Sequence, residues 1–195
     1  FFNSCLISAP LNSDFINNIK WVLGKLFNFG FFGVYRSFNV QNIFKPNIEK
    51  NHNDLAEKYF NKNFYKLKNK KDLLKTKVGN IFIGDLIYDT YIKSRIVPTI
   101  NLNSNDFKVF YLDFLKLTYF WIDYFRTNQI EGIVTSHTVY SYGLPLRIAI
   151  NFKIPGYVFS SSGVLKIDKK NNLGGLYGDY RSYKKRFLYL KNNFK

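Results

Sequence analysis

The chain lacks methionine and holds a single cysteine, Cys5, among its 195 residues. One cysteine cannot form an internal disulfide, so a disulfide-stabilised secreted domain is excluded and a reducing compartment is favoured. Only two histidines are present, His52 and His137, and no cysteine–histidine cluster has the spacing of a metal site. Phosphate-binding glycine loops of the Walker and GxGxxG kinds and the serine-hydrolase elbow are also missing. The sequence therefore predicts no bound metal and no resident cofactor.

Acidic residues are scarce, since 13 Asp and Glu stand against 29 Lys and Arg, a formal net charge of +16. Such an excess attracts nucleic acid, anionic lipid or phosphorylated ligands. A general bias of the chain toward Asn, Lys, Ile, Phe and Tyr explains the charge equally well, because the lysines are scattered over polar segments. The charge by itself leaves the partner open.

Signals for secretion or membrane insertion are missing too. The first ten residues have no basic start and too short an apolar run for a signal peptide. The longest apolar helix that the sequence predicts, 106–126, is interrupted by Lys108, Asp113, Lys116, Asp123 and Arg126, and a membrane-spanning helix tolerates such charges poorly. With 46% apolar residues the chain can bury a large core, and we expect this helix to lie in it.

Apolar periodicity predicts alternating strands and helices. Strands are predicted over 5–10, 31–35, 78–84, 132–136 and 154–160, and helices between Ser13 and Gly30 and over 55–74, 85–95, 106–126 and 144–152. The segment 41–53 is predicted to be a polar connection with His52 on the surface. Because strand–helix–strand units build parallel sheets, we predict an α/β fold, a Rossmann-like parallel sheet with flanking helices.

Residues 1–166 are predicted to form this Rossmann-like N-terminal domain, and residues 167–195 a basic linker or the start of a further region. The chain begins without methionine and ends on a basic, aromatic run. These ends indicate a fragment of a larger protein.

The first candidate site follows the strand predicted over 78–84. In open α/β sheets ligands bind beyond the carboxyl ends of the strands. Gly84 would permit a tight turn into the helix, and Asp85 and Asp89, four residues apart, would share one helical face with Lys93 one turn further on. A general base that deprotonates a hydroxyl is the natural role for one of these carboxylates. The structural alternative is stabilisation of the helix dipole by the aspartates, with Lys93 neutralising Asp89.

The second and third candidate sites follow the strands predicted over 132–136 and 154–160. His137 stands directly after the first of these strands, where it would act as a base, donate to a phosphate or sugar, or simply cap the next helix. Arg147 on the following helix could hold a phosphate or carboxylate through its planar fork, and the run 160–163 could supply donors to an anion. An ordinary surface arginine and an ordinary loop are equal alternatives.

Three segments carry a resemblance to a known family: 83–93, which contains the string GDLIYDTYIK, 98–100, and 136–143 with the string SHTVYSYG. They resemble bacterial surface-polysaccharide (capsule or O-antigen) biosynthesis proteins, which are similar to glycosyltransferases of the GT-B type. The resemblance spans residues 6–164. It implies two facing Rossmann-like domains, of which this chain is the acceptor-side half, and a nucleotide-sugar donor bound by the other half.

The resemblance also implies the roles of the site residues. Asp85, Asp89 and His137 would border the cleft, one of them as catalytic base toward the acceptor hydroxyl. Substrate-binding positions would be Gly84, Tyr88, Arg95, Ser136, Tyr140 and Arg147. The acceptor would be a saccharide or lipid-linked, and the enzyme cytoplasmic with a peripheral contact to the inner membrane.

Other functions stay open on the sequence. A basic nucleic-acid-binding module is disfavoured because the aromatic residues follow core periodicity and do not alternate with basic ones on a strand face. A different transferase or an epimerase on a similar fold, and a non-catalytic assembly module, fit the same pattern.

Overall fold

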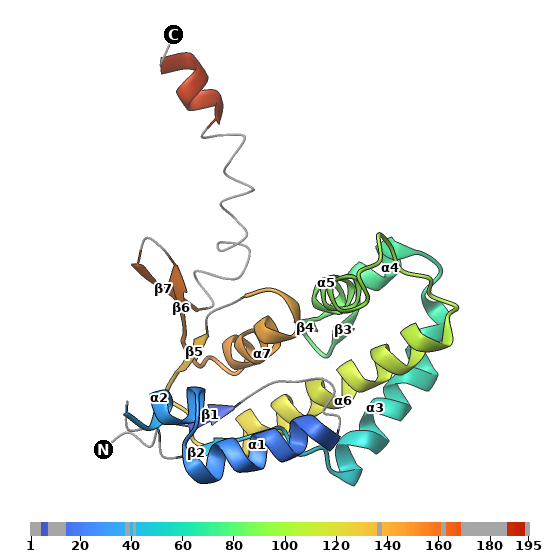
Figure 1. The fold of residues 1–195 in the computed structure, drawn as a ribbon. Helices are drawn as coiled ribbons and strands as arrows, with labels where there is room; N and C mark the ends of the chain where they lie inside the picture. The colour runs from blue at the N-terminus through green and yellow to red at the C-terminus, as the bar shows by residue number, and fades with distance from the viewer. Residues whose placement is uncertain are drawn as a thin grey trace.

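The computed structural model describes residues 5–7, 15–37, 40, 42–135, 138–160, 163–168 and 187–193. This part of the chain is a mixed α/β structure in which helices predominate (Figure 1). The helices are α1 (Phe15–Phe27), α2 (Phe31–Ser37), α3 (Lys50–Asn63), α4 (Lys70–Leu74), α5 (Gly84–Arg95), α6 (Asn105–Thr127) and α7 (Leu144–Asn151), with 3-10 turns η1 (Phe64–Lys66) and η2 (Tyr140–Gly143). The strands are β1 (Cys5–Ile7), β2 (Asn42–Phe44), β3 (Lys77–Val78), β4 (Ile81–Phe82), β5 (Ile133–Thr135), β6 (Gly156–Ser160) and β7 (Gly163–Ile167). Residues 187–193 are helical.

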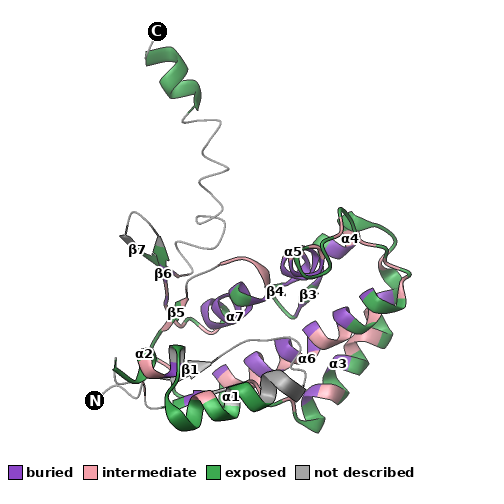
Figure 2. Ribbon diagram, viewed as in Figure 1, coloured by how far each residue is buried: buried purple, intermediate pink, exposed green. Residues whose placement is uncertain are grey.

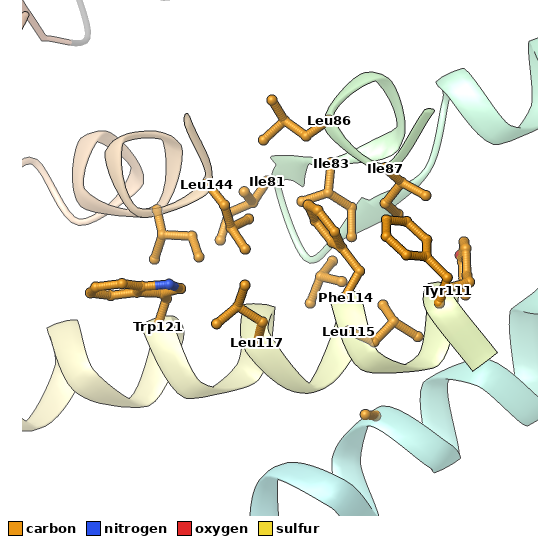
Figure 3. Packing of buried hydrophobic residues seen from close by; sticks show 14 of the residues in the cluster. Ile81, Ile83, Leu86, Ile87, Tyr111, Phe114, Leu115, Leu117, Trp121 and Leu144 are labelled. Carbon is orange, nitrogen blue, oxygen red and sulfur yellow. The ribbon is translucent and has the colours of Figure 1, made fainter. Parts of the chain in front are cut away.

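Helix α6 is the centre of the core. Its first turn is capped by Ser104, whose hydroxyl accepts the Phe107 amide at 3.2 Å. Helix α3 packs along one side of α6, while α5, α7 and the β3–β4 hairpin cover the other side (Figure 1, Figure 3). Large side chains from all these elements meet there, and Phe114, Leu115 and Leu144 are fully buried. The prediction of a core helix over 106–126 is confirmed.

The strands of the described residues form three separate small sheets and no continuous parallel sheet. β1 pairs with β2 in parallel, β3 with β4 antiparallel, and β6 lies between β5 (parallel) and β7 (antiparallel). The strand predicted over 78–84 is instead a hairpin, because Gly79 at φ 58° turns the chain between β3 and β4. The strand predicted over 132–136 exists as β5, but it is not buried throughout, since Val134 is 63% exposed.

The strand–helix–strand unit predicted at the start of the chain is present, but its second strand lies later in the sequence than predicted. Residues 31–35, predicted as a strand, belong to helix α2, and β2 lies in the segment predicted as a polar connection. The aromatic side chains favoured a strand by propensity, but Phe32 is buried against Gly24 of α1, where a Cβ would come within 2.7 Å of its ring. This tertiary contact stabilises a corner between two helices and overrides the local preference.

The helix predicted over 55–74 consists of α3, η1 and α4, and the prediction for His52 was wrong. His52 lies in the first turn of α3 and is 3% exposed. Its Nδ1 accepts the Glu49 amide at 3.0 Å, and its Nε2 lies 3.5 Å from an Asp123 carboxylate oxygen on α6. The hydrogen bond at Nδ1 and the nearby carboxylate at Nε2 permit burial of the imidazole. The lysines of the 66–77 segment are all exposed, as expected for a solvated surface.

A search for membrane-spanning helices, confined to the described residues, finds none of sufficient length and apolarity.

Candidate functional site

The first residues of α5 are held by the end of α4. The Thr76 carbonyl, just after α4, accepts the amides of Ile83 and Gly84 at 3.0 and 3.2 Å, which joins the end of α4 to the start of α5. A Cβ at Gly84 would lie 2.0 Å from the Leu73 carbonyl oxygen, so only glycine permits this approach of the two backbones. Gly84 therefore has a packing role, and it fixes the direction in which α5 starts.

Asp85, one residue further, forms an ion pair with Arg147 of α7. The two guanidinium Nη atoms each donate to one oxygen of the Asp85 carboxylate, and Nη1 also donates to the Phe82 carbonyl at 3.1 Å. The Arg147 side chain is 8% exposed and that of Asp85 is 41% exposed. Because a bidentate pair fixes both partners, the Asp85 carboxylate is a structural negative charge and not a free base.

Asp89 lies one helical turn beyond Asp85 and is half-buried. Burial raises the pKa of its carboxyl group above the ordinary value, and the negative charge of Asp85 raises it further, while the positive charges of Arg147 and Lys70 act in the opposite direction. In the part of the chain that the structure describes, no hydrogen bond or ion pair engages the Asp89 carboxylate. A carboxyl group with these properties is able to accept and return a proton.

Tyr88, on the neighbouring face of α5, is buried against α4. Lys70 donates from Nζ to the Tyr88 hydroxyl at 2.9 Å, and the same ammonium lies 4.0 Å from the centre of the Tyr88 ring. Both residues line a cavity of about 390 Å³ next to the loop that precedes α6. Tyr88 thus lies at a cavity whose volume is in the range of small-molecule sites, and its role in binding substrate stays a prediction.

Tyr140 lies near the C-terminal end of α5, where it contacts Lys93. It begins η2, which packs against α5, and its φ of 59° is unusual for a residue with a side chain. The Lys93 ammonium lies 4.0 Å from the centre of the Tyr140 ring. Lys93 therefore packs on an aromatic ring, and no ion pair with Asp89 is present among the described residues.

Arg95 lies apart from this group. Its guanidinium donates two hydrogen bonds to Asp106 of α6, at 2.9 and 2.8 Å, and the Tyr91 hydroxyl donates to the same carboxylate at 2.9 Å. The hydrogen bond from Arg95, followed by that from Tyr91, lowers the pKa of Asp106. Arg95 thus links α5 to α6, and its contact with substrate stays a prediction.

The structure brings together residues that lie about sixty positions apart in the chain, Gly84 to Asp89 with Tyr140 and Arg147. Ser136 and His137 lie outside the described residues. Lys70 was missed as a member of the site, because nothing in the sequence pairs a lysine of the 66–77 segment with Tyr88. The described residues contain no group of three His, Cys, Asp or Glu side chains that could hold a metal ion.

Comparison of the chain with protein-family models, with curated proteins and with solved structures finds no match.

Proposed function

We propose that the chain is the acceptor-side part of a GT-B-type glycosyltransferase acting in bacterial surface-polysaccharide synthesis, with Asp89 as its base. The proposal depends on one observation: the carboxylates of Asp85 and Asp89, one helical turn apart, lie in different environments. Asp85 is fixed by Arg147, whereas the half-buried Asp89 has no ion-pair or hydrogen-bond partner among the described residues. Pairs of carboxyl groups in unequal environments are typical of proton-transfer sites.

In the proposed step the acceptor hydroxyl loses its proton to the Asp89 carboxylate. Its oxygen forms a bond to the anomeric carbon of the donor sugar, and the bond from that carbon to the nucleoside diphosphate breaks. The diphosphate leaves with the bonding electron pair. The burial that raises the pKa of Asp89 makes the carboxylate a stronger proton acceptor than an exposed aspartate.

Asp85 and Arg147 act as positioning residues in this proposal. Their ion pair ties the first turn of α5 to α7 and places a fixed negative charge beside Asp89. The negative charge opposes ionisation of Asp89, so it strengthens this carboxylate as an acceptor of the hydroxyl proton. His137 remains the alternative base of the sequence analysis.

Two local units support the finer fold assignment. β1 and β2 are parallel and joined through α1 and α2, and β5 and β6 are parallel and joined through α7. Both are strand–helix–strand units of the kind from which Rossmann-like domains are built. Arg147 lies on the helix that follows β5, where such domains bind ligands.

The donor site, a cytoplasmic location and a peripheral contact with the inner membrane remain parts of the proposal. A saccharide or lipid-linked acceptor would meet Asp89, and a second domain would bind the nucleotide sugar. The net charge of +16 suits a surface close to anionic lipid.

The test is a transfer assay with the full-length protein, a panel of labelled nucleotide sugars and a membrane extract as acceptor. Asp89→Asn should lower transfer about 100-fold or more, the usual contribution of a general base. The matched control is Asp54→Asn, the same change at an exposed position of α3, which should leave transfer unchanged.

Two further variants separate the roles. Asp85→Asn should lower both transfer and stability, because it leaves the buried Arg147 guanidinium without its carboxylate. His137→Ala tests the alternative base. Full transfer by Asp89→Asn with loss in His137→Ala would move the base to His137. No transfer from any donor, together with nucleic-acid binding that weakens steeply with salt, would replace the proposal with a binding module.

A further inference from the structure

A cavity of about 390 Å³ lies between α4, α5 and the loop 99–103 that leads into α6. Its size is within the range of small-molecule sites. No acidic residue is among the ten that line it, which are Lys68, Asn69, Lys70, Leu73, Tyr88, Thr99, Ile100, Asn101, Leu102 and Asn103. The cavity therefore combines two cations, neutral hydrogen-bonding groups and an apolar part.

The cationic wall is held in place by its neighbours. Lys70 is fixed by the hydroxyl and ring of Tyr88, which is itself only 8% exposed. Among the described residues no ion pair joins the nearby Asp72 to Lys68 or Lys70, and one of its oxygens accepts the backbone amides of Lys68 and Asn69, at 2.9 and 3.2 Å. Both ammonium groups are thus available to an anion.

The opposite wall is an ordered loop. The Asn101 side-chain oxygen accepts the Asn103 amide at 3.0 Å, and the Asn101 carbonyl accepts both the amide and the hydroxyl of Ser104, at 3.1 and 2.9 Å. The hydrogen bond to the Asn101 side-chain oxygen fixes this amide group, and Thr99 and Asn101 both line the cavity. Such groups suit a ligand that carries several hydroxyls.

We propose that this cavity binds an anionic monosaccharide, a sugar that carries a phosphate or a carboxylate. Lys68 and Lys70 hold the anion, Thr99, Asn101 and Asn103 bind the hydroxyls, and Tyr88 supplies an aromatic wall. Lys70 also acts electrostatically on Asp89, the residue that follows Tyr88 in α5. That the bound sugar is the acceptor rests on the proposed function, whereas the binding itself does not.

The test is calorimetric titration of the full-length protein with glucose 6-phosphate, glucuronate, glucose and inorganic phosphate. One of the two anionic sugars should bind at least tenfold more tightly than glucose, and the preferred one identifies the anion. Lys70→Gln should weaken that ligand about tenfold, the loss of one charge-assisted hydrogen bond. Lys71→Gln, which removes the same charge from an exposed neighbour outside the cavity, should leave the affinity unchanged.

Asn101→Ala tests recognition of the sugar hydroxyls. It should weaken the anionic sugar while leaving inorganic phosphate unaffected. Equal affinity for glucose and both anionic sugars, equal loss in Lys70→Gln and Lys71→Gln, or phosphate binding as tight as that of glucose 6-phosphate would overturn the proposal. Because the titration contains no donor, binding without transfer would reject only the proposed function, and transfer without binding would reject only this site.

Discussion

Helices α1 and α6 have the same kind of apolar periodicity and opposite environments. In α6 the apolar side chains are buried between α3 on one side and α5 and α7 on the other. In α1 the apolar side chains at i, i+3, i+4, i+7 and i+8 are exposed, as Figure 2 shows for most of its length. These are Ile19, Val22, Leu23, Leu26 and Phe27.

The difference teaches that periodicity specifies a helix and one apolar face, but not what covers the face. The face of α6 meets aromatic and aliphatic side chains from four elements, so its contribution to stability is large (Figure 3). The described residues do not bury the apolar face of α1 in this way, so this face contributes far less to stability. We therefore expect equal substitutions in the two helices to have very different effects.

The largest expected effect comes from a matched pair of leucines. Leu115 in α6 is fully buried, and Leu26 in α1 is 69% exposed. Leu115→Ala should lower the free energy of unfolding by about 3–5 kcal/mol, through lost apolar burial and the cavity left behind. Leu26→Ala should change it by less than about 0.5 kcal/mol, as at other surface positions. Urea unfolding followed by circular dichroism measures both, and equal losses would show that α1 is covered in solution.

A matched pair of glycines sharpens the comparison. A Cβ at Gly84 would meet the carbonyl oxygen of Leu73 at 2.0 Å, whereas one at Gly24 would meet the ring of Phe32 at 2.7 Å. A backbone carbonyl moves less easily than a ring, so Gly84→Ala should destabilise by about 3 kcal/mol. Gly24→Ala should be close to neutral, because about 1 kcal/mol of gained helix propensity offsets the shift of the ring. Thermal unfolding checks both, and a neutral Gly84→Ala would contradict the close approach of α4 and α5.

Sequence periodicity predicted the long elements and missed features that depend on tertiary contacts. The helices over 85–95, 106–126 and 144–152 are present within a residue or two. The strand predicted over 31–35 failed because Phe32 packs on Gly24, and the one predicted over 78–84 failed because the Gly79–Asn80 turn was not recognised as a hairpin signal. A short apolar run fits a helix or a strand equally well, and contacts with residues distant in the sequence decide between the two.

The candidate site shows the same limit. The spacing of Asp85 and Asp89 placed both carboxylates on one helical face, but it could not show that Arg147, 62 residues away, engages one of them. Burial of His52 was equally hidden, since its partner Asp123 lies on another helix. The sequence thus identified candidate residues, whereas their burial and their ion pairs became visible only in the folded structure.

The third prediction concerns the residues that follow the last turns of helices α1 and α5. The chain leaves α1 through Asn28 in the left-handed region at φ 55°, whereas α5 ends on Ile96 at φ 54°. A β-branched residue is strained there, and Ile96 is 92% exposed, so its side chain contributes little burial. Ile96→Gly should therefore raise the free energy of unfolding by about 1 kcal/mol. Asn28→Ala should lower it slightly, and denaturant midpoints compare the two. A loss of stability in Ile96→Gly would mean that its side chain is buried in solution.

The smallest expected effect is a dependence on pH at Asp89. Its pKa in the folded protein is raised above 3.8 by burial and by Asp85, so the folded state binds this proton more tightly than the unfolded chain does. Stability from this residue is therefore greatest below pH 3.8, falls as the pH rises through the folded pKa, and stays lower at neutral pH.

Asp89→Asn removes this penalty, so the variant should be more stable than the wild type at pH 7 and equal to it near pH 3. Asp54→Asn on the exposed face of α3 controls for the general loss of a negative charge from a strongly basic protein. Unfolding curves across this pH range test the difference between the two variants. If Asp89→Asn lost stability at pH 7 relative to Asp54→Asn, the carboxylate would have a stabilising partner in solution and would not be the free group on which the proposed proton transfer depends.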